Sequence, residues 1–254
     1  MSVLYVADDF GLLPTIDRAI MALAEARALD ATSVLINERP RALPELARNR
    51  DLHIGLHLDL TGGRPHSAPE SIPDLVGADG RFHPLPQLIT RTLRGAIRRS
   101  SLIREISEQL AALETAIGRS ADHIDGHQHV HCLPVVFAAL EVVLARREHA
   151  QPRLRLGRIA DAARNPRLLP VDALIGWQRF RRAIGLTQWD FLAPDVTFDY
   201  GASALRAAHP DQLTEVMLHV AHPGEPDARL DDTSYPYAAR VAQFERRMTE
   251  AGRA

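Results

Sequence analysis

The chain has 254 residues, of which 46% are hydrophobic, and this length and composition are typical of a folded globular protein rather than a disordered one. Its 30 Lys and Arg residues against 32 Asp and Glu residues give a net charge of −2, which excludes an overall basic field for nucleic acid. Cys132 is the single cysteine, so an intrachain disulfide is excluded. No apolar run approaches the ~18 residues of a membrane span, and we expect no signal peptide, because the first strand-like run has no basic region or cleavage site before it. We therefore expect a cytoplasmic protein.

Short β-like runs alternate with helical patterns along the chain. In order, we predict a strand at 3–7, a helix at 16–26, a strand at 32–36, a short helix at 40–49, a strand at 52–60, a helix at 102–117, a strand at 123–131, a helix at 136–144, a strand at 214–220 and a helix at 235–248. Residues 61–90 are rich in Gly, Pro and His and are expected to form an insertion or lid loop. The alternation predicts an α/β fold with a mostly parallel sheet. We expect one domain over residues 1–254, an irregular, TIM-barrel-like (β/α) barrel, because polar residues recur where the strands end.

The segment HIDGHQHVH holds four of the twelve histidines of the chain within nine residues. Its polar side chains lie two residues apart: His123, Asp125, His127, His129 and His131. If the whole segment is extended, these side chains share one face and span about 26 Å at ~3.3 Å per residue. One or two of them can then bind a metal ion, while their neighbours support those ligands or contact a substrate.

Two adjacent aspartates, Asp8 and Asp9, follow the first apolar run in the motif ADDFG. Because neighbouring residues point in different directions, we expect one carboxylate to bind a cation and the other to handle protons. A helix cap or turn before Pro14 is the alternative interpretation of this pair.

A histidine and an aspartate alternate with leucines in GLHLDLTGG, so His57 and Asp59 face the same way. A lone histidine in a strand is more often structural than functional. Together, however, Asp9, His57 and His127 make a set of one carboxylate and two imidazoles. Such a set leaves room for water and is typical of an open catalytic metal site.

Two late histidines, His219 and His222, lie in and just after the strand-like run of MLHVAHPGE. A histidine at a strand end can donate a proton to a leaving group, and a turn histidine is the alternative. Cys132 follows the histidine-rich segment, so a Cys-His nucleophile is one interpretation. A buried small apolar side chain is the commoner role of a lone cysteine. The signatures of serine hydrolases, P-loop nucleotide hydrolases and dinucleotide enzymes do not occur in the sequence.

These motifs together resemble the YdjC-like family of carbohydrate deacetylases. ADDFG, a G-x-H followed by LT, HIDGHQHVH and a late EVM followed by HPG occur in the family's order and approximate spacing. The resemblance covers nearly the whole chain. It implies an irregular (β/α) barrel that hydrolyses an N-acetyl group with one divalent ion, Mg²⁺ in the first place and Zn²⁺ as the alternative.

The resemblance also implies roles for single residues. Asp9, His57 and His127 correspond to the metal ligands and Asp8 to the general base, and we expect His222 to act as the acid. Further substrate-binding or supporting residues are expected at Asp59, Arg64, His123, Asp125, His129 and His219. The two late histidines depart from the family's usual single histidine, so either can be the acid. Family members commonly continue past the last helix into a final strand, so we expect either an incompletely closed barrel or a C-terminus that differs from theirs.

The expected partner is an acetylated sugar of the chitooligosaccharide type, without nucleic acid and without a membrane span. Both a monomer and a homodimer remain open. Two other functions stay in competition. One is a metal-dependent amidase or phosphoesterase that acts on a substrate other than a sugar, and the other is a sugar-binding homologue without activity.

Overall fold

A computed structural model describes residues 3–148, 151–159, 162, 166–185, 195–197, 213–231, 233 and 235–252. Its strands are β1 (Val3–Phe10), β2 (Ala31–Val34), β3 (His53–Leu58), β4 (His123–Gly126), β5 (Arg153–Leu154), β6 (Arg158–Ile159), β7 (Asp195–Thr197) and β8 (Thr214–Leu218). Its α-helices are α1 (Pro14–Glu25), α2 (Leu43–Leu46), α3 (Leu85–Leu93), α4 (Arg99–Ile117), α5 (Pro134–Ala145), α6 (Leu169–Ala183) and α8 (Tyr237–Ala251). Short 3₁₀ turns are η1 (Ile36–Glu38), η2 (Pro69–Ser71), η3 (His127–Cys132), η4 (Pro166–Leu168) and η5 (Ala228–Leu230).

The strands form one parallel sheet in the order β5-β4-β3-β2-β1-β8-β7-β6. This arrangement confirms the predicted α/β fold, since parallel neighbours require crossover connections and most crossovers here contain a helix. Strand β1 lies inside the sheet, with β2 to β5 following on one side of it and β8 to β6 on the other. All the carboxyl ends of the strands therefore meet at one edge, where a barrel places its chemistry.

The two outer strands, β5 and β6, are consecutive pieces of one segment. Only residues 155–157 separate them, too few for a crossover, so the two pieces cannot pair with each other as parallel neighbours. Instead β5 pairs with β4 and β6 pairs with β7. The sheet is therefore open within this interrupted segment, whereas β8 pairs with both β1 and β7.

Side-chain contacts across the sheet show that it is curled. Three strands separate β4 from β8 in the sheet order, so a flat sheet would hold them about 19 Å apart at ~4.8 Å per strand. Nevertheless Asp125 of β4 and Glu215 of β8 both form ion pairs with Arg155, which lies between β5 and β6. These side chains therefore point into the interior of a partly closed barrel.

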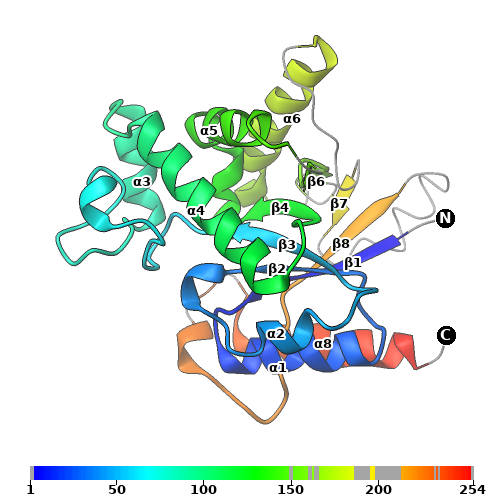
Figure 1. The fold of residues 1–254 in the computed structure, drawn as a ribbon. Helices are drawn as coiled ribbons and strands as arrows, with labels where there is room; N and C mark the ends of the chain where they lie inside the picture. The colour runs from blue at the N-terminus through cyan, green and yellow to red at the C-terminus, as the bar shows by residue number, and fades with distance from the viewer. Residues whose placement is uncertain are drawn as a thin grey trace.

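The helices cover the sheet with their apolar faces. In Figure 1, α1 and α8 lie side by side on one side of the strands, and α4 packs against α5 on the other. The buried side of α4 carries apolar residues at intervals of three and four, as the sequence pattern predicted: Leu102, Ile106, Leu110, Leu113 and Ile117. Among the described helices, none is both long and apolar enough to cross a membrane.

Two local predictions differ from the structure. The predicted strand at 123–131 ends at Gly126, because Gln128 and His129 take left-handed backbone angles (φ 52° and 58°) and turn the chain into η3. The prediction that five polar side chains share one extended face is therefore wrong. In addition, the loop at 61–90 is partly ordered by η2 and by the first turns of α3.

Candidate active site

The end of β1 presents two adjacent carboxylates to the same edge of the barrel. A bulge in the β1–β2 ladder falls between Ala7 and Phe10, and Asp9 takes a left-handed conformation with φ 72°. Without the bulge, Asp8 and Asp9 would point to opposite faces of the sheet. As a result both carboxylates are buried in the interior, and each faces a different set of partners.

Asp9 lies between two imidazoles. Its Oδ1 is 3.4 Å from Nε2 of His57 and 3.1 Å from Nδ1 of His127. Its other oxygen, Oδ2, accepts a hydrogen bond of 3.0 Å from Arg240 in α8. Burial alone would raise the pKa of Asp9, but His127, His57 and Arg240 hold that pKa well below its usual range. Asp9 is therefore an ionised carboxylate with one oxygen turned to the two histidines.

His57 is oriented by a second carboxylate on the neighbouring strand. Its Nδ1 lies 2.6 Å from Oδ1 of Asp125, which is completely buried. A proton on Nδ1 then faces Asp125, so Nε2 is the nitrogen directed towards Asp9. Burial lowers the pKa of His57, but the charge of Asp125 and its hydrogen bond more than compensate and raise that pKa well above 6.5. A histidine backed by a carboxylate in this way is typical of metal ligands.

Asp8 is held by a different group of residues. Ser33 Oγ donates to its Oδ1 at 3.0 Å, and the guanidinium of Arg155 donates to both carboxylate oxygens at 2.7 and 2.9 Å. Asp8, His57 and Asp125 also have potential ligand atoms within 4.8 Å of one another. The carboxylates of Asp8 and Asp125 are already paired with the positively charged Arg155, however, so this second set disfavours a cation.

Arg155 is the centre of a buried charge network. Besides Asp8, it contacts Asp125 at 2.5 Å and forms an ion pair with Glu215. Burial raises the pKa of Glu215 to about 7, and the nearby charges of Asp8 and Asp125 act in the same direction, while Arg155 opposes them. Because three carboxylates meet one guanidinium, the position of each depends on Arg155.

The two late histidines occupy different surroundings. The His219 ring stacks on Tyr235 with ring centres 4.0 Å apart, and its electrostatic partners include Asp8 and Asp9. Burial lowers the pKa of His219 to about 4. His222 instead lies beside the start of α1 and against α8. Its backbone N–H donates to the Thr15 carbonyl, and the centre of its ring lies 5.8 Å from that of Phe244. Because Leu218 pairs with Ala7 of β1, His219 follows beside Asp8, whereas His222 contacts the start of α1.

The remaining predicted residues separate into two groups. Asp59 lines a pocket of about 190 Å³ that also contacts His127. His123 and His129 are not among the described ligand groups that converge on Asp9. Arg64 is exposed, the ring of the buried His123 packs over Gly55, and His129 lies next to His131 in the turn of η3.

Arg155 and Arg240 are site residues that the sequence analysis missed. Arg155 alternates with two leucines in RLRLGR, which is a strand pattern with charged residues on one face. The two strands here are too short for this alternation to predict them from the sequence. Arg240 lies in a helix with many other charged residues, and only its burial distinguishes it.

Comparisons with known proteins agree with this architecture. A carbohydrate deacetylase from Homo sapiens is 34% identical over 138 residues, which are 54% of this chain and 43% of that protein. A chitooligosaccharide deacetylase from Yersinia enterocolitica is 30% identical over 137 residues, 53% of this chain and 52% of that protein. The aligned part thus spans about half the length of these curated relatives.

The fold and the family are supported independently. A crystal structure of a candidate cellobiose-phosphate cleavage protein from Enterococcus faecalis V583 superposes with a TM-score of 0.70 and 18% identity, over 98% of this chain and 93% of that one. At this identity the likeness shows a shared fold alone. The family model for YdjC-like proteins matches residues 3–251, nearly the whole chain. The chain therefore belongs to the YdjC-like protein family.

Proposed function

We propose that this protein hydrolyses the N-acetyl group of an acetylated amino sugar, with a divalent ion bound by Asp9, His57 and His127. The observation that carries the proposal is the convergence of one carboxylate oxygen and two imidazole nitrogens within 4.8 Å of one another. The names of the relatives, carbohydrate deacetylase and chitooligosaccharide deacetylase, support the choice of substrate.

The donor atoms fit a metal ion by distance as well as by type. Ligands about 2.0–2.2 Å from one ion lie about 2.8–3.6 Å apart at octahedral or tetrahedral angles. The separations of 3.1 and 3.4 Å from Asp9 Oδ1 to the two imidazoles fall in this range. Because imidazoles suit Zn²⁺ better than Mg²⁺, the expected magnesium and the alternative zinc both enter the test.

Asp8 is proposed as the general base. A carboxylate offers about four lone-pair sites, and the hydrogen bonds from Ser33 and Arg155 use three of them. One site remains for the proton of an attacking water, whose direction is then set by the fixed carboxylate. When bound, a divalent ion in such a site polarises a carbonyl group and lowers the pKa of water.

For the proton donor we propose His219 in place of His222. His219 lies near Asp8 and Asp9, and its ring is fixed by stacking on Tyr235, so a leaving amine at the same edge is within its reach. Its lowered pKa makes it neutral near pH 7, so the proton that it gives to the amine would first have to come from the attacking water by way of Asp8. The prediction for His222 as acid finds no support in its contacts with Pro223 and α1.

Paired variants of the adjacent aspartates test the proposal. Asp8→Asn should keep metal affinity near that of wild type and lower acetate release by about 10²–10⁴-fold, the usual contribution of a positioned base. Asp9→Asn should weaken metal binding directly, because it removes the only carboxylate of the set. Calorimetric titration with Zn²⁺ and Mg²⁺ and acetate release from N,N′-diacetylchitobiose measure the two effects. The opposite pattern would exchange the two roles, and full activity in both variants would refute the deacetylase function.

A further inference from the structure

A pocket opens beside the proposed metal ligand His127, and its other walls have no assigned role. Its volume is about 190 Å³, larger than the ~150 Å³ cavity that holds a benzene ring, so a six-membered ring fits. The pocket is lined by residues that follow four strands, β1, β2, β3 and β4: Leu12, Leu35, Glu38, Asp59, Thr61, Gly62, Gly63, Arg81 and His127. It lies at the edge of the barrel where a substrate must enter.

Asp59 is a preorganised hydrogen-bond acceptor in this pocket. The residue is only 4% exposed, and its Oδ1 accepts hydrogen bonds from the N–H and the hydroxyl of Thr61 at 2.8 and 3.3 Å. Among the described residues, none donates to Oδ2. Oδ2 lies directly against Gly63 of the pocket lining, because a methyl group added at this glycine would lie 2.2 Å from the oxygen. Asp59 lines the pocket with this second oxygen unpaired, so it is free to accept a hydrogen bond from a ligand.

Helix α4 holds this wall in place from behind. Gln109 accepts from the N–H of Asp59 at 3.1 Å and donates to its carbonyl at 2.7 Å. Glu105, completely buried, accepts from Gln109 and from the N–H groups of His66 and Ser67. Both ends of the loop 60–65 are therefore tied to one helix, and the pocket wall is fixed before any ligand binds.

The polar groups of the pocket complement a neutral polyol. Carboxylates such as Asp59 and Glu38 only accept hydrogen bonds, and the guanidinium of Arg81 only donates them. A sugar hydroxyl does both, so vicinal hydroxyls can satisfy all three groups, and the apolar side chains of Leu12 and Leu35 can meet the C–H face of a ring. A phosphate would be repelled by two carboxylates.

We infer that this pocket binds the hydroxyl-bearing ring of the substrate, with Asp59 and Glu38 as acceptors and Arg81 as donor. The inference rests on the proposed deacetylase function and names the residues that distinguish a sugar from a simple acetamide. Glu38 and Arg81 are exposed at the rim of the pocket, while Asp59 is buried. The ring would thus lie between the loop after β3 and the η1 turn.

The test compares a sugar with an amide that lacks hydroxyls. Wild type, Asp59→Asn and Glu38→Gln are assayed for acetate release from N,N′-diacetylchitobiose and from N-acetylcyclohexylamine. Each variant should lower the preference for the sugar by about 10–100-fold, mainly through a higher KM, because a hydrogen bond to a charged group is lost. Glu70→Gln, an exposed carboxylate of the same loop outside the pocket, is the matched control and should leave the preference unchanged.

Other outcomes separate this inference from the proposed function. Wild-type sugar preference in both pocket variants would overturn the inference while the deacetylase function stands. If wild type hydrolyses neither compound, the proposed function fails, and calorimetric binding of N-acetylglucosamine to wild type and Asp59→Asn then tests the pocket alone. Equal binding, or no binding, to the two proteins would overturn it. Tighter binding of glucosamine than of N-acetylglucosamine would also overturn it, since the pocket would then select an ammonium group.

Discussion

Replacement of Asp125 by asparagine tests whether a buried carboxylate prepares His57 to bind a metal ion. The carboxylate lies 2.6 Å from His57 Nδ1 and 2.5 Å from Arg155. Asparagine keeps the shape and one acceptor oxygen but removes the charge. Hydrogen bonds to charged groups contribute about 1.5–3 kcal/mol, and Arg155 retains Asp8 and Glu215, so the loss falls mainly on His57. This loss corresponds to about a 10–100-fold weaker metal affinity, the range expected for a carboxylate behind a ligating histidine.

Calorimetry with Zn²⁺ and Mg²⁺ measures that affinity, and NMR titration of the imidazole in metal-free protein gives a second readout. Burial lowers the pKa of His57 and Asp125 is the largest influence that raises it, so Asp125→Asn should lower this pKa. The protons released on metal binding near neutral pH should decrease in parallel, because a ligating imidazole must be neutral.

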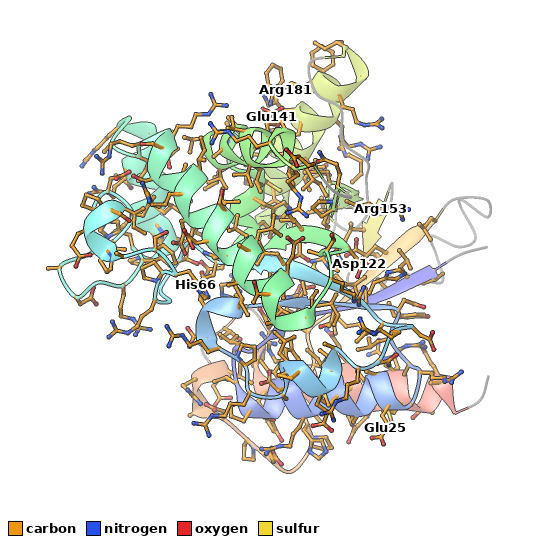
Figure 2. The ribbon with its side chains drawn as sticks, viewed as in Figure 1. Glu25, His66, Asp122, Glu141, Arg153 and Arg181 are labelled. Atoms are coloured by element: carbon orange, nitrogen blue, oxygen red, sulfur yellow. The ribbon has the colours of Figure 1, made fainter. Side chains whose placement is uncertain are left out.

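A matched control exists at the other end of these two strands, where His53 begins β3 and Asp122 precedes β4. His53 and Asp122 form a similar pair at 3.1 Å, but His53 is largely exposed. Figure 2 shows Asp122 near the starts of the strands, at the end opposite to His66. Asp122→Asn should therefore leave metal affinity unchanged. If Asp125→Asn also keeps the wild-type affinity, or if the two variants lose affinity equally, His57 does not bind the metal in the orientation that Asp125 imposes.

Two further predictions concern histidines. His219→Asn should lower acetate release by about 10²–10⁴-fold while His222→Asn stays within about twofold of wild type, and a loss confined to His222→Asn would return the acid role to that residue. Burial lowers the pKa of His123 to about 4, so between about pH 6.5 and 4 the folded protein binds fewer protons than the unfolded chain. The free energy of unfolding should therefore decrease by on the order of 3 kcal/mol as the pH falls through this range. His123→Phe keeps a ring over Gly55 without the titration and should flatten this dependence in urea unfolding between pH 7.5 and 4.5; parallel curves for the two proteins would contradict the argument.

The local pattern of the sequence was enough to predict the class of fold and several residues with potential metal-ligand atoms. Strand and helix periods depend on neighbours a few residues apart, so β1, β3, β8, α4 and α5 could be predicted from the sequence alone. Since parallel strands end at one edge, polar residues at those ends were expected to meet. The structure brings Asp9, His57 and His127 within 4.8 Å, as that reasoning predicted.

Backbone turns at the strand ends were beyond the sequence pattern. The alternation in HIDGHQHVH is the same in an extended strand and in the turn that the chain adopts after Gly126. Only the left-handed angles at Gln128 and His129 separate His127 from the histidines that follow it. Likewise the bulge at Asp8 and Asp9, which turns both carboxylates inward, has no composition signal of its own.

Tertiary structure alone decided which charges surround the proposed metal ligands. Arg155 reaches Asp8 across 147 residues of sequence, and Arg240 reaches Asp9 across 231. No local period encodes such pairs, because they depend on how far the sheet curls and where the last helix packs. The sequence therefore determined which donor residues lie at the strand ends, whereas the curled sheet determined the buried arginines that fix their positions and charge states.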